Sequence, residues 1–184
     1  MVTLDGFFAG PNGEIDWHIV DEEFNQYAID LLNTVDTILF GRKTNQLFES
    51  YWPAAATSPS TSKSDLEIAH QINNMTKVVF SRTLDRVEWK NARLLKEIIP
   101  QEIVKMKQQP GKDMVIYGSG SIVSALMNMG LIDECRIIVN PVTLGNGKPL
   151  FKGLKDRLNL ELLKTKTFSS GNVLLSYQPD RKEA

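Results

Sequence analysis

The sequence has little cysteine and little histidine, and this excludes several kinds of site. Cys135 is the one cysteine in 184 residues, so an internal disulfide framework and a multi-cysteine metal site are both impossible. The two histidines, His18 and His70, would need carboxylates to complete a metal site. Neither histidine has a partner pattern, so we expect no metal and place both side chains on the surface.

Neither sign of charge is in excess. The chain has 21 Lys and Arg against 22 Asp and Glu, which gives no reason to expect binding to nucleic acid or to an anionic membrane. Residues 1–13 have neither the basic start nor the apolar core of a signal peptide. No apolar run approaches the ~20 residues that cross a bilayer. We therefore expect a cytoplasmic protein whose partner is a small-molecule substrate.

The spacing of apolar residues predicts alternating strands and helices. A helical period runs from Glu22 to Val35, and residues 158–168 and 172–179 flank a Ser-Ser-Gly turn that predicts an antiparallel hairpin. Short apolar runs predict strands at 37–40, 77–80, 114–117 and 135–142. The expected fold class is α/β, with a mixed, mainly parallel sheet flanked by helices and a C-terminal antiparallel hairpin. The length suits a single domain over residues 1–184.

A glycine turn, Gly118–Ser121, follows one of these apolar runs and opens a predicted helix. The Rossmann fingerprint requires a third glycine where Val123 stands, and too few residues follow for a doubly wound domain. Glycines still let a backbone approach a ligand, and the amides at a helix start attract phosphate. By itself this segment is equally typical of an ordinary tight turn.

Two other predicted strands end in similar polar groups. Gly41-Arg42-Lys43-Thr44 follows the run TILF, and Ser81-Arg82-Thr83 follows KVVF. Ligands of open α/β sheets gather at the carboxyl ends of strands, and arginine and hydroxyl groups suit phosphate. Each cluster alone is typical of a solvated surface, but three at strand ends predict one shared site for a phosphate-containing ligand.

Four segments together resemble a known family. They are TLDGFFAGPNGEIDW, DTILFGRKT, VVFSRTL and VIYGSGSIVSALMNMGLIDECRIIVNPVTLGNGKPLF. This combination resembles the dihydrofolate reductase-like superfamily. More narrowly, it is similar to the C-terminal reductase domain of the bifunctional riboflavin-biosynthesis deaminase/reductase and to its stand-alone bacterial relatives. The resemblance extends from Thr3 to about Tyr177.

The resemblance implies a sheet of about eight strands that binds NADPH. It assigns the pyrophosphate and 2′-phosphate to residues 41–44, the rest of the 2′-phosphate site to 81–83, and the pyrophosphate and nicotinamide ribose to 118–122. The candidate cofactor-binding residues are Gly41, Arg42, Lys43, Thr44, Ser81, Arg82, Thr83, Gly118, Ser119, Gly120, Ser121 and Ile122. Two arginines and a lysine fit the 2′-phosphate of NADP better than the ribose diol of NAD, which prefers an acidic residue.

The sequence also departs from the family. A full apolar strand normally precedes the LDGF motif, whereas only Met1 and Val2 precede Thr3 here, so we expect a short first strand. The cysteine and histidine set of a zinc deaminase is absent, and we expect a stand-alone reductase domain. Related proteins imply a homodimer, and the C-terminal hairpin offers a strand edge that can pair.

Three carboxylates are candidates for the proton donor that reduction of a C=N bond needs. Glu22 stands five residues after Trp17, the spacing found in dihydrofolate reductases. A helical projection instead turns Asp21 inward and Glu22 outward, although Asp21 is equally suited to cap the helix. Asp5 is the third candidate, and Asp5-Gly6 equally predicts a simple turn.

Aromatic side chains complete the expected site. Trp17 and Tyr51 are candidate walls for a flat heteroaromatic substrate, while Trp52 is expected in the core. The expected function is NADPH-dependent transfer of a hydride to a small flat heterocycle of pterin or pyrimidine type. The alternatives are a protein that binds NADP(H) without catalysis and a protein that keeps only the fold.

Overall fold

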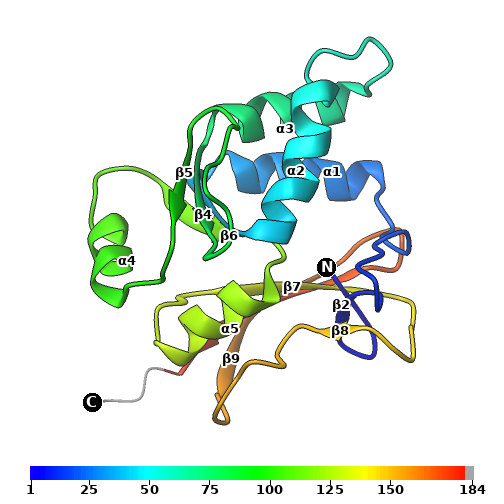
Figure 1. Cartoon of the computed structure of the whole chain (residues 1–184). Helices are drawn as coiled ribbons and strands as arrows, with labels where there is room; N and C mark the ends of the chain where they lie inside the picture. The colour runs from blue at the N-terminus through cyan, green and yellow to red at the C-terminus, as the bar shows by residue number, and fades with distance from the viewer. Residues whose placement is uncertain (181–184) are drawn as a thin grey trace. The chain divides into compact units, whose positions relative to one another are not determined.

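The computed structural model describes residues 1–180, and their contacts divide into two compact units (Figure 1). One unit is the continuous segment Glu22–Ile122. The other combines Met1–Asp21 with the chain from Val123 onward. Each unit has its own sheet. The expectation of a single domain over residues 1–184 stays a prediction.

The unit 22–122 is built around a four-stranded parallel sheet with the order β5-β4-β3-β6. Its strands are β3 (Val35–Gly41), β4 (Thr76–Phe80), β5 (Ala92–Leu95) and β6 (Asp113–Ile116). Its helices are α1 (Glu22–Leu32), α2 (Arg42–Ala55), α3 (Lys63–Asn74) and α4 (Pro100–Lys107). No helix in the described part of the chain is both long and apolar enough to cross a bilayer.

The apolar core of this unit joins the sheet to the helices. Ile38 and Phe40 of β3 are fully buried and lie in one cluster with Ile29 of α1 and Ile72 of α3. Residues two apart on a strand share one face, and the helical period of α1 and α3 turns their apolar stripes toward it. Trp52 packs against the same cluster, as expected.

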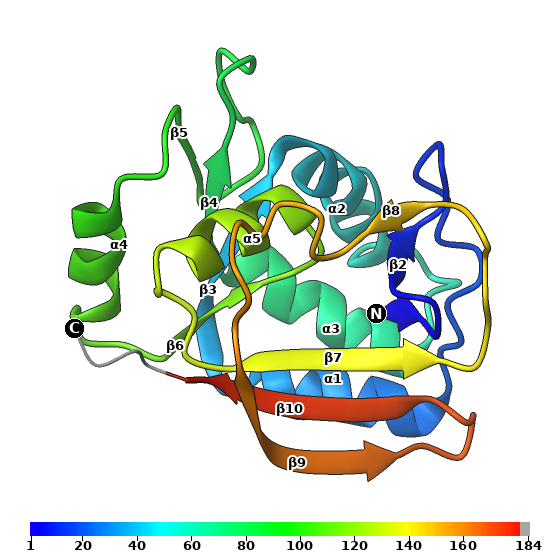
Figure 2. The ribbon, with the colours of Figure 1, turned by 90° about the horizontal axis from the view of Figure 1, so that it is seen from below.

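The second unit contains a mixed four-stranded sheet with the order β1-β7-β10-β9. Its strands are β1 (Val2–Thr3), β7 (Cys135–Asn140), β9 (Leu160–Thr167) and β10 (Val173–Pro179). β1 is parallel to β7, and the other two pairs are antiparallel, so β7, β10 and β9 lie side by side (Figure 2). A separate pair joins β2 (Phe7–Ala9) to β8 (Lys148–Pro149).

The structure confirms the α/β fold class, with its helix-flanked parallel sheet and its C-terminal antiparallel hairpin. It differs from the expectation in two details. Within residues 1–180 the hydrogen-bonded strands form two four-stranded sheets and one pair, where a sheet of about eight was expected. The first helix ends at Leu32 and not at Val35. The Thr34 hydroxyl donates a hydrogen bond to Leu31 O in the turn that follows the helix, and Val35 is already the first residue of β3.

Candidate functional site

Three of the predicted polar segments leave the same edge of the parallel sheet. β3 lies between β4 and β6, Gly41 is paired with Phe80, and Leu39 is paired with Ile116. The carboxyl ends of the three strands are therefore neighbours. The structure brings together the segments that follow them, namely Gly41–Thr44, Ser81–Thr83 and Gly118–Ile122.

The turn after β6 has two consecutive residues with left-handed backbone, Gly118 at φ 54° and Ser119 at φ 51°. Glycine adopts this conformation readily, whereas a serine there costs about 1–2 kcal/mol. The Ser119 hydroxyl accepts a hydrogen bond from the Gly41 N–H at 2.8 Å and donates one to Thr44 Oγ1 at 2.9 Å. These two bonds offset the strain and join the turn after β6 to the turn after β3.

The backbone at Gly41 lies close to two side chains, which would have to shift slightly to admit a larger residue there. A Cβ there would lie 3.3 Å from Ile122 Cγ1 and 3.4 Å from Ser119 Oγ. Two helices start at this edge, α2 at Arg42 and α5 (Gly120–Asn128) at Gly120. Gly41 is the N-cap of α2 and offers no side-chain cap, so the first amides of α2 remain suited to an anionic ligand.

In the turn after β4, Ser81 has a structural role and the next residue, Arg82, is exposed. The buried Ser81 hydroxyl accepts hydrogen bonds from the backbone N–H groups of Thr83 at 3.2 Å and Leu84 at 3.1 Å. Ser81 therefore shapes the turn, while the side chain of Arg82 is exposed. Arg42 and Lys43 are exposed as well, which makes this edge of the sheet cationic and suited to phosphate.

The candidate acids Asp21 and Glu22 differ in their surroundings. The Asp21 carboxylate accepts hydrogen bonds from the Ser170 N–H at 3.1 Å and the Ser169 hydroxyl at 3.3 Å. Asp21 is half-buried, whereas Glu22 is exposed at the first position of α1. The hairpin turn between β9 and β10 thus fixes the carboxylate of Asp21 in place.

Two buried asparagines that sequence reasoning missed hold the segment before Asp21. Asn140 Oδ1 accepts a hydrogen bond from the Ile19 N–H at 3.0 Å, and Asn172 Nδ2 donates to Ile19 O at 2.8 Å. Both side chains are fully buried. The one signal in the sequence is that an amide ends the apolar run of β7 at Asn140. These bonds position the backbone between Trp17 and Asp21.

The aromatic candidates lie in different units and have different exposures. The rings of Trp17 and His18 are in edge-to-face contact, with their centroids 4.4 Å apart. The indole Nε1 of Trp17 is buried without a hydrogen-bond partner among the described residues. Tyr51 of α2 is half-exposed and contacts Trp52. His18 is half-buried and not on the surface as expected, and this burial lowers its pKa to about 4; His70 is exposed, as expected.

Asp5 holds a loop together. Its carboxylate accepts hydrogen bonds from the Thr3 hydroxyl at 2.6 Å, the Gly145 N–H at 2.8 Å and the Leu144 N–H. The bond from Thr3, followed by those from the two amides, lowers the pKa of Asp5. Gly6 follows with a left-handed backbone and donates to Thr3 O, which favours the turn-forming role of this motif.

The protein is an α/β protein whose parallel sheet has a cationic carboxyl edge, an arrangement that suits phosphate-containing ligands. A family model, described as the RibD C-terminal domain, matches residues 1–174. The chain therefore belongs to the RibD C-terminal domain family. This membership and the reductase fold indicate an oxidoreductase related to riboflavin biosynthesis.

Known proteins match this chain, in sequence or in structure, over nearly its whole length. YyaP of Bacillus subtilis (strain 168), described as uncharacterized, is 43% identical over 176 residues, 96% of this chain and 90% of YyaP. A Shewanella sp. PV-4 protein assigned to riboflavin biosynthesis has TM-score 0.73 and 23% identity, covering 98% of this chain and 96% of that one. Dihydrofolate reductase from Enterococcus faecalis, solved with NADP(H), has a TM-score of 0.60 and 17% identity, covering 98% of this chain and 93% of that one. The last two establish a dihydrofolate reductase-like fold.

Proposed function

We propose that the protein is an NADPH-dependent reductase that passes a hydride to a small flat heterocycle of pterin or pyrimidine type. The observation that carries this proposal is the meeting of three turns at the carboxyl ends of β4, β3 and β6. The family membership and the complex of a structurally similar reductase with NADP(H) support the same cofactor.

The residues at this edge suit NADPH better than NADH. The exposed Arg42, Lys43 and Arg82 are the side chains that would hold the 2′-phosphate. The uncapped start of α2 and the turn Gly118–Ile122 would hold the pyrophosphate. None of the three turns contains an acidic residue, the usual partner of the ribose diol of NAD.

Asp21 is our choice of proton donor. When bound, the cofactor supplies the hydride, and the protein must supply a proton at the acceptor nitrogen. The hydrogen bonds from Ser169 and Ser170 hold the Asp21 carboxylate in one place, as a catalytic acid requires. The alternative carboxylates are Glu22, which is exposed to solvent, and Asp5, which accepts a hydrogen bond from the Gly145 N–H.

Asp21→Asn tests this assignment, with Glu22→Gln as the neighbouring control. We expect the asparagine variant to lose roughly 100-fold or more in NADPH-consuming turnover on a panel of pterins and aminopyrimidines, since general acids contribute about 10²–10⁴. NADPH binding, followed by its fluorescence, is expected to be unchanged. Full turnover in Asp21→Asn excludes Asp21 as the donor. NADPH binding by the wild-type protein without any turnover supports the non-catalytic alternative.

We also propose a homodimer formed through β9. This strand is hydrogen-bonded to β10 on one side, and Leu162 and Leu163 are 52% and 50% exposed. Such an edge is a template for strand pairing. Antiparallel pairing of two β9 strands, centred between Leu163 and Lys164, sets Glu161 of one copy opposite Lys166 of the other, which favours self-association.

A further inference from the structure

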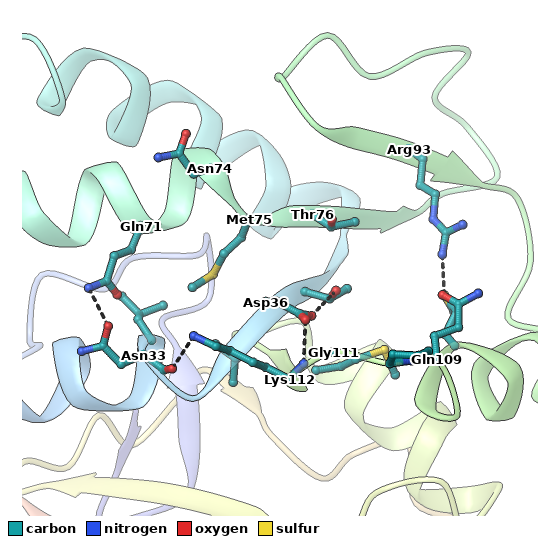
Figure 3. Close-up of a pocket in the computed structure, with 16 residues that line it drawn as sticks. Asn33, Asp36, Gln71, Asn74, Met75, Thr76, Arg93, Gln109, Gly111 and Lys112 are labelled. Carbon is teal, nitrogen blue, oxygen red and sulfur yellow. Dashed lines mark hydrogen bonds between the residues drawn. The ribbon is translucent and has the colours of Figure 1, made fainter.

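A cavity of about 660 Å³ lies at the amino-terminal edge of the parallel sheet (Figure 3). The Asp36 carboxylate in its lining accepts hydrogen bonds from the Lys112 N–H at 2.7 Å and the Thr37 hydroxyl at 2.8 Å. The Lys112 ammonium group donates to Asn33 O at 2.8 Å. These bonds join β3 to the segment before β6, so these groups have a structural role and we assign the cavity no ligand.

The other unit contains two chemically reactive dipeptides, Asn12-Gly13 and Asn146-Gly147. An asparagine followed by glycine is especially prone to lose its side-chain amide, because glycine has no side chain to hinder attack by its backbone nitrogen. Both asparagines are exposed. Exposure alone therefore does not distinguish them, but their hydrogen bonds do.

The fold holds the reacting atoms of Asn12 in place. Its Nδ2 donates to Glu14 Oε1 at 2.7 Å, and its backbone N–H donates to Glu14 Oε2 at 3.0 Å. The N–H of Gly13, which would have to attack, donates to Gly10 O at 3.1 Å. The side chain cannot reach the backbone nitrogen of Gly13 for ring closure until these bonds break.

Asn146 lies in a loop without such restraints. Within residues 1–180, neither its side chain nor the Gly147 N–H forms a hydrogen bond. The preceding residue, Gly145, has a left-handed backbone with φ 69°, so a glycine stands on each side of Asn146 and the chain there bends easily. The loop is anchored just before this point, where the Gly145 N–H donates to the Asp5 carboxylate at 2.8 Å.

We propose that Asn146 is a site of spontaneous deamidation and that the fold protects Asn12 from the same reaction. The backbone nitrogen of Gly147 attacks the side-chain carbonyl carbon of Asn146 and gives up its proton. A bond forms between these two atoms, the Cγ–Nδ2 bond breaks, and the amide nitrogen leaves as ammonia with that proton. Water then opens the five-membered imide at one of its two carbonyls, which leaves aspartate or isoaspartate at position 146.

The product changes the surroundings of β8. A Cβ at Gly147 would lie 2.5 Å from Ala9 O, and the next residue, Lys148, is paired with Ala9 in the β2–β8 pair (Figure 2). Isoaspartate lengthens the main chain by one methylene group directly before Gly147. We therefore expect isoaspartate to displace Lys148 and loosen this pair, whereas aspartate only adds a charge to the loop. The proposal does not depend on the reductase activity.

Mass spectrometry of peptides from the whole protein, aged in mildly alkaline buffer made with water enriched in heavy oxygen, tests the proposal. In the folded protein we expect Asn146 to take up the label at least about tenfold faster than Asn12, since Asn12 must first lose its hydrogen bonds. In urea the ratio is expected to fall below about threefold, because both dipeptides are then unrestrained. Equal rates in the folded protein, or a ratio that urea leaves unchanged, overturns the proposal.

Glu14→Ala tests the protection of Asn12 directly. It removes the carboxylate that holds Asn12, and we expect labelling of Asn12 to become at least about fivefold faster while that of Asn146 stays the same. Asp16→Ala removes an exposed carboxylate two residues further along and is the matched control, with both rates as in the wild type. An unchanged rate at Asn12 in Glu14→Ala contradicts the proposed protection.

Hydrogen exchange tests the effect on β2. We expect the amides of Phe7–Ala9 to exchange faster in the isoaspartate form, separated by ion exchange, than in the fresh protein. Asn146→Asp carries the new charge without the longer chain and is expected to exchange as the fresh protein does. Unchanged exchange in the isoaspartate form, or equally fast exchange in Asn146→Asp, overturns the link between chain length and the β2–β8 pair.

Discussion

Ser119 shows how one side chain maintains a strained turn at the candidate cofactor site. Its backbone is left-handed, and its hydroxyl bonds both Gly41 and Thr44. Ser119→Ala keeps the strain and leaves the Gly41 N–H without its partner, so we expect a loss of about 1–3 kcal/mol in the free energy of unfolding. Ser119→Gly also loses the bonds but relieves the strain.

Urea denaturation of the two variants separates these effects. Ser119→Gly is expected to be more stable than Ser119→Ala by about 1 kcal/mol, because glycine adopts a positive φ without penalty. Both variants should bind NADPH more weakly than the wild type, since the turn after β6 is no longer joined to the turn after β3. Equal stability of the wild type and Ser119→Ala would show that the hydroxyl bonds contribute nothing.

Lys77 is a charged residue in the interior of the unit 22–122. It is fully buried at the start of β4, where its ammonium group donates to Asn73 O at 2.7 Å, Met75 O at 3.0 Å and Lys90 O at 3.1 Å. It also lies 4.5 Å from the centre of the Trp89 ring. The side chain thus satisfies carbonyls at the end of α3 and in the loop before β5.

Lys77→Met is expected to lower the free energy of unfolding by about 2–4 kcal/mol, because it leaves these buried carbonyls unpaired. Lys105→Met, which removes an exposed lysine of α4, is the matched control and should change the stability by less than about 0.5 kcal/mol. Chemical denaturation at neutral pH measures both. A Lys77→Met protein as stable as the control would mean that water replaces the ammonium without penalty.

The pH dependence of stability gives an independent test of the environment of Lys77. Burial lowers the pKa of Lys77 from 10.5 to about 8. Between these two values the unfolded chain holds a proton that the folded protein has released, so stability rises with pH in this window. The stability of the wild type relative to Lys77→Met is therefore expected to increase from about pH 8 to about pH 10. An unchanged stability difference over this window would show that the carbonyls keep the lysine charged.

At the scale of elements, the exposed edge of β9 leads to a prediction about assembly. Replacing Leu162 and Leu163 together by lysine places like charges on the strand that is proposed to pair with itself, and we expect a monomer where the wild type is a dimer. Leu47→Lys on α2 is the control, since Leu47 is 48% exposed. Sedimentation analysis at about 100 μM measures the states. A monomeric wild type excludes the proposed dimer.

The elements that sequence reasoning located well are those with a local signal. The helical period of α1, the short apolar run of β3 and the Ser-Ser-Gly turn before β10 each depend on neighbouring residues. The end of α1 was placed three residues late, since Val35 fits the helical period but is buried as the first residue of β3. Periodicity alone does not distinguish these two forms of burial.

At the scale of the whole molecule, the three turns could be predicted together because parallel strands carry their carboxyl ends to one edge. The contacts that support the other candidates join distant residues and have no local signature. Asn140 and Asn172 bond Ile19 across more than 100 residues of sequence, and the hairpin turn bonds Asp21. The burial of His18 and Lys77 likewise depends on packing that a single sequence does not display.

The central claim is that the cationic edge of the parallel sheet binds the 2′-phosphate of NADPH. Fluorescence titration with NADPH and with NADH tests it on the wild type, on Arg82→Ala and on a control variant, Arg86→Ala. In the wild type the exposed guanidinium of Arg86 pairs with Glu88. We expect Arg82→Ala to weaken NADPH by ~1.5–3 kcal/mol, roughly 10- to 150-fold in Kd, and to leave NADH little changed. Arg86→Ala is expected to bind as the wild type does. Failure of the wild type to bind either nucleotide, or equal binding of both, would contradict the claim.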